Sequence, residues 1–199
     1  MTAIDMPTTP GFTTSRFYLE TNTQTFESPL TKDTQRMVLG GSRWVGSYSL
    51  PPMHRAQAAA WQAFLLKLQG RANTFNAYDP DKKSPLGAAT GTPLVNGANQ
   101  TGSTIITADW GHSITALKAG DMFSFGELKM ATADAITDSS GNVTISFQPP
   151  IRTSPADNTP IVTYKPTCTM ILTDDAQASW DCDKNGIYQA KTFTAAEVF

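Results

Sequence analysis

A run of alternating acidic and amide residues near the C-terminal end is the sharpest motif with metal-binding potential in the sequence. Asp181-Cys-Asp-Lys-Asn-Gly follows the pattern D-x-D-x-N-G, which opens a calcium loop. The twelfth position of such a loop requires a bidentate Glu, and here it is Thr192. Asp183 to Gly186 is also an ordinary hairpin-turn signal, and its flanks alternate like strands. We therefore predict a structural turn with no metal ion at Asp181, Asp183 and Asn185.

The cysteines and histidines do not form a recognisable metal or catalytic set. Cys168 and Cys182 could provide half of a zinc site, but a closed site needs four ligands, and neither His54 nor His112 has ligand spacing to them. A catalytic histidine needs a nucleophile and an orienting acid, and no Gly-x-Ser-x-Gly elbow accompanies either one. We expect two idle thiols, which pair only if the protein meets oxidising conditions. His112 is interpreted as a turn residue.

Two pairs of carboxylates are spaced like those of a glycosidase. Asp79 with Asp81, and Asp174 with Asp175, each lie among turn residues with no aromatic sugar platform evident nearby. We interpret both pairs as solvated loops. With no phosphate-binding Gly-rich motif either, the sequence predicts no catalytic residues, no cofactor and no enzymatic activity.

The large aromatic side chains have two possible roles. They could line a ligand pocket, but strand alternation and helical spacing favour packing in a core. The residues concerned are Trp44, Tyr48, Trp61 and Phe64.

Composition narrows the classes of function. Fifteen basic and 17 acidic residues give a net charge of −2, and there is no basic run, so sequence-specific nucleic-acid binding is not expected. Charged residues make up only 16% of the chain, which suits surfaces that neighbouring subunits cover. The N-terminus lacks the pattern of a signal peptide, and the apolar stretch 58–68 is too short to span a membrane. Two cysteines fit assembly in a reducing cytoplasm.

Hydrophobic periodicity predicts a β-rich chain with one helix. Residues 1–14 are interpreted as an N-terminal arm, followed by strands at 15–21, 33–39 and 43–50, with Gly40-Gly41 as a hairpin turn. An apolar stripe predicts an amphipathic helix at 53–69 with Gly70 at its C-terminal cap, and a return strand follows at 71–78.

A change in composition after residue 87 predicts a second unit. Short strands separated by Gly, Asn and Asp turns fill residues 88–148, and Pro149-Pro150 is taken as the exit. Strands at 161–164, 167–173 and 187–193 are expected to return to the main domain. The predicted fold is mainly β: a barrel or sandwich core, 15–87 plus 149–199, with one flanking helix and a small inserted all-β domain.

The order of these elements is similar to a known family. The stretch from Gln35 to Met53, Gln-Arg-Met-Val-Leu-Gly-Gly-Ser-Arg-Trp-Val-Gly-Ser-Tyr-Ser-Leu-Pro-Pro-Met, resembles the N-terminal region of bacteriophage distal tail proteins and related minor tail (tail hub) proteins. The similarity continues through 55–75 to Asp79-Pro80. Residues 117–125 and 141–152 resemble the β insertion that tail and virion proteins often carry.

The resemblance implies a structural role in the virion. Its family forms a ring, commonly a hexamer, that joins the tail tube to the tip or baseplate and leaves a channel for DNA. The implied partners are further copies of the chain, the tail tube protein, and tip, hub or fibre proteins, in a virion assembled in the host cytoplasm. The uncharged segments 22–26 and 167–173 are expected to offer edges for neighbours. The alternative hypothesis is a host-surface or carbohydrate-binding module, which an exposed aromatic cluster in 88–148 would favour.

Overall fold

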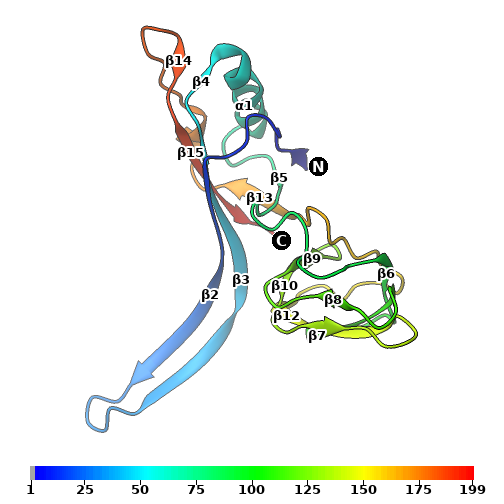
Figure 1. Ribbon diagram of the computed structural model, residues 1–199. Coiled ribbons are helices and arrows are strands. Elements are labelled where there is room, and N and C mark those ends of the chain that lie inside the picture. The colour runs from blue at the N-terminus through cyan, green and yellow to red at the C-terminus, as the bar shows by residue number, and fades with distance from the viewer. Residues whose placement is uncertain (1–2) are drawn as a thin grey trace.

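The protein is mainly β with a single α-helix in the part of the chain that its computed structural model describes, residues 3–199 (Figure 1). This confirms the predicted fold class: curled sheets form the core, one helix flanks it, and an all-β unit is inserted. The main sheet has six strands in the order β1-β5-β13-β15-β3-β2, namely Ile4–Asp5, Phe75–Ala77, Cys168–Leu172, Lys191–Glu197, Thr34–Leu50 and Thr14–Glu27.

The helix α1, Arg55–Leu68, lies against this sheet and begins later than predicted. Met53 and His54 were predicted to be helical, but they form a short strand, β4, which pairs with β14 (Ile187–Tyr188). At the C-terminal end, Gly70 is left-handed as predicted, with φ +65°, and the residue before it is left-handed too. Gln69 adopts the left-handed conformation, and its N–H bonds to the carbonyl of Leu66.

Aromatic side chains fill the space between helix and sheet, as their spacing predicted. Trp44, Tyr48, Trp61 and Phe64 are all buried. The Trp61 ring lies 5.9 Å from Phe193 of β15 and meets Phe64 edge-on at 5.9 Å. These contacts join one face of the helix to the main sheet.

The predicted N-terminal arm docks onto this core. Its first two residues lie outside the described part, but Ile4 and Asp5 pair in parallel with β5. Phe12 packs 4.9 Å from the Tyr48 ring, and the Trp61 indole N–H donates to the carbonyl of Pro10 at 3.3 Å.

The inserted unit has a separate core and extends further than predicted. Its five-stranded sheet has the order β6-β7-β12-β10-β9, namely Gly91–Val95, Gly102–Trp110, Val143–Ile151, Leu128–Ala131 and Met122–Ser124. A second small sheet pairs β8 (Thr115–Leu117) with β11 (Ala135–Ile136). Phe123, Phe125 and Phe147 pack together at the centre of its core.

The exit from this unit lies past Pro149-Pro150, so the predicted boundary at residue 148 is wrong. Strand β12 continues through both prolines, which a register shift between Ser146 and Ile151 accommodates. Ile161 belongs to the inserted core, and its N–H bonds to the carbonyl of Pro93 at 2.9 Å. Residues 161–164, expected as a strand of the main domain, therefore begin with contacts to the insert, which ends near residue 162.

Candidate interaction surface

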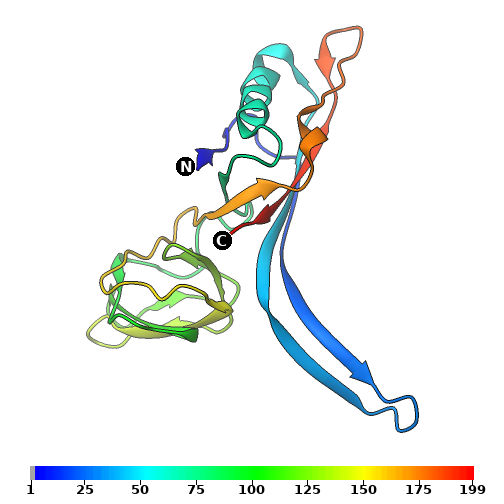
Figure 2. The same ribbon diagram turned by 180° about the vertical axis from the view of Figure 1, so that it is seen from behind.

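Strands β2 and β3 form one long hairpin whose outer half projects away from the core (Figures 1 and 2). Pairing runs from Thr14 opposite Ser49 to Glu27 opposite Thr34. Residues 28–33 make the turn, closed by the bond from the Ser28 N–H to the Asp33 carbonyl at 2.9 Å. The hairpin turn predicted at Gly40-Gly41 is therefore wrong, because both glycines lie within β3.

The two glycines mark a bulge that separates the hairpin into two halves. Glu20 pairs with Arg43 and Asn22 with Leu39, so residues 40–42 oppose the single residue Thr21. Gly41 has φ +94°, a conformation that favours glycine, and this lets β3 accommodate the extra residues. We call residues 21–41, beyond this bulge, the outer hairpin.

The inner half of the hairpin is anchored in the core. Phe17 of β2 stacks on Trp44 of β3, with ring centroids 5.4 Å apart. The Trp44 indole N–H donates to the carbonyl of Leu128 at 2.9 Å, which ties the hairpin base to β10 of the insert. Next to the bulge, Glu20 and Arg43 form an exposed ion pair at 2.6 Å.

The outer hairpin has no such cover. Every residue from 21 to 41 is exposed except Ser28, which is half-buried. Leu30 at the turn is 93% exposed, Val38 is 81% exposed and Phe26 is 65% exposed. A two-stranded hairpin on its own is at best marginally stable in water, so this segment is suited to lying against a partner.

The two faces of the outer hairpin differ in charge. Residues paired across an antiparallel ladder lie on the same face, so the register shows on which face of the hairpin each side chain lies. One face, which we call the neutral face, carries no charge and joins Phe26, Met37 and Leu39 to three amides. The other face carries Arg36, Glu27, Val38 and threonines. The amides of the neutral face are Asn22, Gln24 and Gln35.

A groove lies between the base of the hairpin and the insert. Two adjoining hollows share Leu19 and Gln148, and the larger has a volume of about 430 Å³. We call them together the base groove. Its walls come from both sides of the bulge and from β10 and β12: Phe17, Tyr18, Leu19, Thr21, Asn22, Val38, Leu39, Gly40, Gly41, Ser42, Trp44, Met130, Thr132, Gln148, Pro150, Ile151 and Arg152.

One end of the groove is held by a buried ion pair that connects insert and core. The Arg152 guanidinium makes two hydrogen bonds to the Glu197 carboxylate, at 2.9 and 3.1 Å, and one to the carbonyl of Ser42. Glu197 also accepts the backbone N–H of Trp44 at 3.0 Å. The only charge on the groove wall is thereby neutralised, because both partners are satisfied.

A second ion pair fixes the segment that directly follows β12. The Lys129 side chain is fully buried, and its ammonium lies 2.6 Å from Glu127 and 2.8 Å from the carbonyl of Pro150. Glu127 also accepts the backbone N–H groups of Arg152 and Thr153. Burial alone would raise the pKa of Glu127, but these hydrogen bonds together lower it. Burial lowers the pKa of Lys129, against the opposing effect of Glu127.

A buried carboxylate fixes the segment that enters the insert. Asp121 accepts the backbone N–H groups of Leu86, Gly87 and Lys118 at 2.8 to 3.0 Å. Glu127 likewise holds the backbone of Arg152 and Thr153, and Arg152 in turn binds Glu197 of the main sheet, so an acidic side chain stands at each of these two contacts between core and insert. Met122 and Leu128 of the insert also pack in the core of the main domain.

The calcium-like motif forms a turn built around Asp183. Its carboxylate accepts the backbone N–H groups of Asn185 at 2.9 Å and Ile187 at 2.8 Å. The N–H of Gly186 bonds to the carbonyl of Asp183 at 3.1 Å. The predicted structural turn is confirmed. Among residues 3–199, no three His, Cys, Asp or Glu side chains come together as metal ligands.

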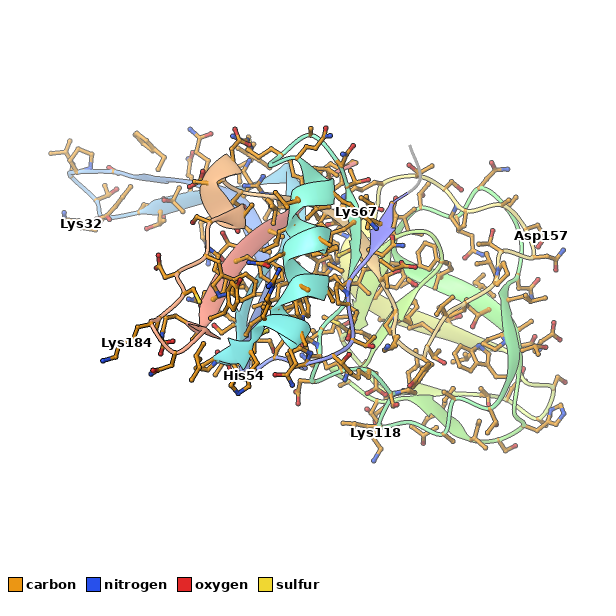
Figure 3. The ribbon with its side chains drawn as sticks, turned by 90° about the horizontal axis from the view of Figure 1, so that it is seen from above. Lys32, His54, Lys67, Lys118, Asp157 and Lys184 are labelled. Atoms are coloured by element: carbon orange, nitrogen blue, oxygen red, sulfur yellow. The ribbon has the colours of Figure 1, made fainter. Side chains whose placement is uncertain are left out.

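The remaining candidate residues are dispersed over the molecule. Cys168 is buried in β13 and burial raises the pKa of its thiol, whereas Cys182 is exposed, and both are free. His54 ends β4, and His112 lies in the turn after β7, as predicted for a turn residue. Figure 3 places His54 at the start of the helix.

The carboxylate pairs hold backbone and do not face each other as an acid and a base. Asp79 is 6% exposed and accepts the N–H of Asp81 at 3.1 Å, so its interpretation as a solvated loop residue is wrong. Asp174 caps a short 3₁₀ helix, η1 (Asp175–Ala178), by accepting the N–H of Ala176. Asp175 accepts the N–H of Arg71 at 3.0 Å.

The aromatic residues of the insert are all internal. Residues 88–148 contain four aromatic side chains, and none is more than 5% exposed. Without an exposed ring, these residues provide no stacking surface for a sugar. The four are Trp110, Phe123, Phe125 and Phe147.

The outer hairpin and the buried ion pairs were not found from the sequence. The predicted turn at Gly40-Gly41 concealed the length of the hairpin. A lone lysine in the strand Leu128-Lys-Met-Ala was the available signal for the second ion pair. The partners Arg152 and Glu197 are 45 residues apart, so no local spacing connects them.

Comparisons with known proteins do not assign the chain to a family. Neither a scan against protein-family models nor a search among curated proteins gives a match. In residues 3–199, α1 and η1 are the helices, and neither is of a length and apolarity to cross a membrane.

Proposed function

We propose that the chain is a structural subunit of a bacteriophage tail that forms a closed ring at the distal end. The ring would join the tail tube to the tip or baseplate and leave a channel for DNA, with six copies as the expected number. The residues that resemble distal tail proteins motivate this proposal, and the outer hairpin is the observation that carries it.

The outer hairpin supports assembly because it places apolar side chains where a single chain cannot cover them. Phe26, Met37 and Leu39 share the neutral face, and Leu30 stands at the turn, far from the core. In addition, β2 is an edge strand of 14 residues, with one side of its backbone unpaired. A monomeric protein commonly protects such an edge with Lys, Pro or a bulge, and only the bulge at Thr21 interrupts it here.

The balance of charge is compatible with a channel that DNA passes. The net charge is −2, and the outer hairpin carries Lys32 and Arg36 against Glu27 and Asp33. A basic wall would bind phosphate groups and slow the passage of DNA. The proposal therefore includes weak or no affinity of the isolated protein for DNA.

The alternative of a carbohydrate-binding module gains no support from the insert, because its aromatic rings are buried. A glycan array tests this alternative directly. Binding that is lost on substitution in residues 88–148 would favour the module over the ring.

The main test is the assembly state. Native mass measurement of the purified full chain, followed by imaging of the virion tail tip, is expected to give a closed cyclic oligomer. Phe26→Ala should weaken the oligomer, whereas Tyr164→Ala, at an equally exposed ring outside the hairpin (both 65%), should not. An isolated monomer on a fibre, or a chain wrapped specifically around DNA, would contradict the proposal.

A further inference from the structure

We infer that the tip of the outer hairpin of one copy seats in the base groove of the next copy. This inference rests on the proposed ring and specifies the contact that would build it. Each chain would donate one tip and accept one, which is a heterologous contact that closes into a ring when the rotation between copies allows it.

The groove offers a surface of the right chemistry. Leu19, Ile151 and Met130 line it and are each half-buried, so an apolar partner would complete their burial. The charged residue on its wall, Arg152, is neutralised by Glu197 at 2.9 Å. Gln148, common to both hollows, is exposed and provides an amide at the centre.

The tip offers the complement. Leu30 is 93% exposed, and Phe26 and Met37 follow it on the neutral face toward the base. The acidic and basic groups near the tip offset each other, since Lys32 pairs with Glu27 at 3.5 Å. A tip with no net charge, with the exposed Leu30 at its end and amides on the neutral face, therefore matches an apolar groove whose one charged side chain is paired and which has an amide at its centre.

The geometry points to a second copy as the occupant. The turn begins at Ser28, seven positions after Thr21 at the bulge, so the tip lies about 23 Å beyond the hairpin base at roughly 3.3 Å per residue. The tip therefore cannot reach the groove of its own chain, and the views agree that it points away from the insert (Figures 1 and 2). The part of the outer hairpin that does not line the groove, 23–37, supplies about 15 residues, somewhat fewer than the roughly 20–30 that one partner contributes to a standard interface.

Cysteine cross-linking between copies tests this contact. One full-length chain carries Leu30→Cys and another carries Gln148→Cys, both with Cys182→Ser to remove the exposed native thiol. The control replaces Gln148→Cys by Asp157→Cys, on a loop at the far end of the molecule from Lys32 at the hairpin turn (Figure 3). Mild oxidation of each mixture, followed by non-reducing electrophoresis, measures the covalent heterodimer.

The expected result is a heterodimer for the first mixture and background for the control. Docking raises the effective concentration of the two thiols to the millimolar range, so at micromolar protein the first mixture should cross-link on the order of 100-fold faster. Equal rates for the two mixtures would overturn the inference. If the wild-type chain forms a closed ring and the rates are still equal, the ring stands and only the contact is wrong. Cross-linking without a closed ring would support the contact and contradict the ring.

A second measurement does not depend on thiol chemistry. Leu30→Asp places a charge at the tip and should weaken self-association by roughly ten- to a hundred-fold, the equivalent of losing one buried leucine. Leu86→Asp, at another exposed leucine outside the hairpin and the groove, is the control and should leave it unchanged. An equal effect of both substitutions, or none, would refute the role of the tip.

Discussion

Replacing Glu127 by Gln would remove the counter-charge of a buried ammonium group without changing the size of the side chain. Lys129 is fully buried, and its other hydrogen-bond partner is the neutral carbonyl of Pro150. A buried charge that loses its partner must be carried at a large desolvation cost or be neutralised. We therefore expect Glu127→Gln to destabilise the connection between insert and core.

The expected loss in the free energy of unfolding is about 3 kcal/mol. Breaking a buried ion pair on one side costs about 3–5 kcal/mol, and the lower end applies because the Gln carbonyl still accepts from Thr153 or Arg152. Glu20 is a matched control, since it lies 2.6 Å from Arg43, the same separation as Glu127 and Lys129. Because both partners of that control pair are about half exposed, Glu20→Gln should cost less than about 1 kcal/mol.

The assay is urea unfolding of the full chain, followed by tryptophan fluorescence. Trp44 is the useful probe because its indole bonds to Leu128, one residue from Lys129. Adding Lys129→Met to Glu127→Gln should restore most of the loss, since the double variant leaves no unpaired charge. Equal losses for Glu127→Gln and Glu20→Gln would refute the reasoning, because burial would then have no effect on the pair.

Three further outcomes are expected. Trp61→Ala should lower the free energy of unfolding by about 3–5 kcal/mol through lost burial and a cavity. Leu66→Ala, on the exposed side of the same helix, should change it by less than about 0.5 kcal/mol. Near-neutral stability of both variants would show that the apolar stripe of the helix does not belong to the core. The pKa of Glu127 is lowered in the folded protein, so its contribution to stability is complete above the unfolded pKa and is lost as the pH falls through the folded pKa. Between about pH 5 and pH 3 the wild type should therefore lose more stability than Glu127→Gln. Parallel curves of the free energy of unfolding against pH for the two proteins would contradict this. Millimolar calcium should leave the melting temperature unchanged, because the Asp183 carboxylate is engaged by the N–H groups of the turn, and a rise that Asp183→Ala abolishes would disprove this.

The boundaries of the inserted unit show how a local signal can mislead. Pro149-Pro150 reads as an exit because proline cannot donate to a strand ladder, but a register shift lets β12 pass through both residues. The unit is also less independent than its turn-rich borders suggested. Asp121 holds the segment that enters it, Glu127 holds the backbone of Arg152, which binds Glu197 of the main sheet, and Leu128 packs in the main core. Removing the unit would therefore also uncover Trp44.

The sequence by itself determined the features that depend on local pattern. Apolar spacing identified the helix that buries Trp61, alternation identified the strand that buries Tyr48, and the Asp183 turn followed from its residue types. Only the tertiary structure decided what depends on distant partners. The outer hairpin exists because Thr21 and Gly41 form a bulge where a turn was expected, and Arg152 meets Glu197 from another part of the chain. Local periodicity records which face of a segment is apolar, but it does not record which segment, or which neighbouring molecule, covers that face.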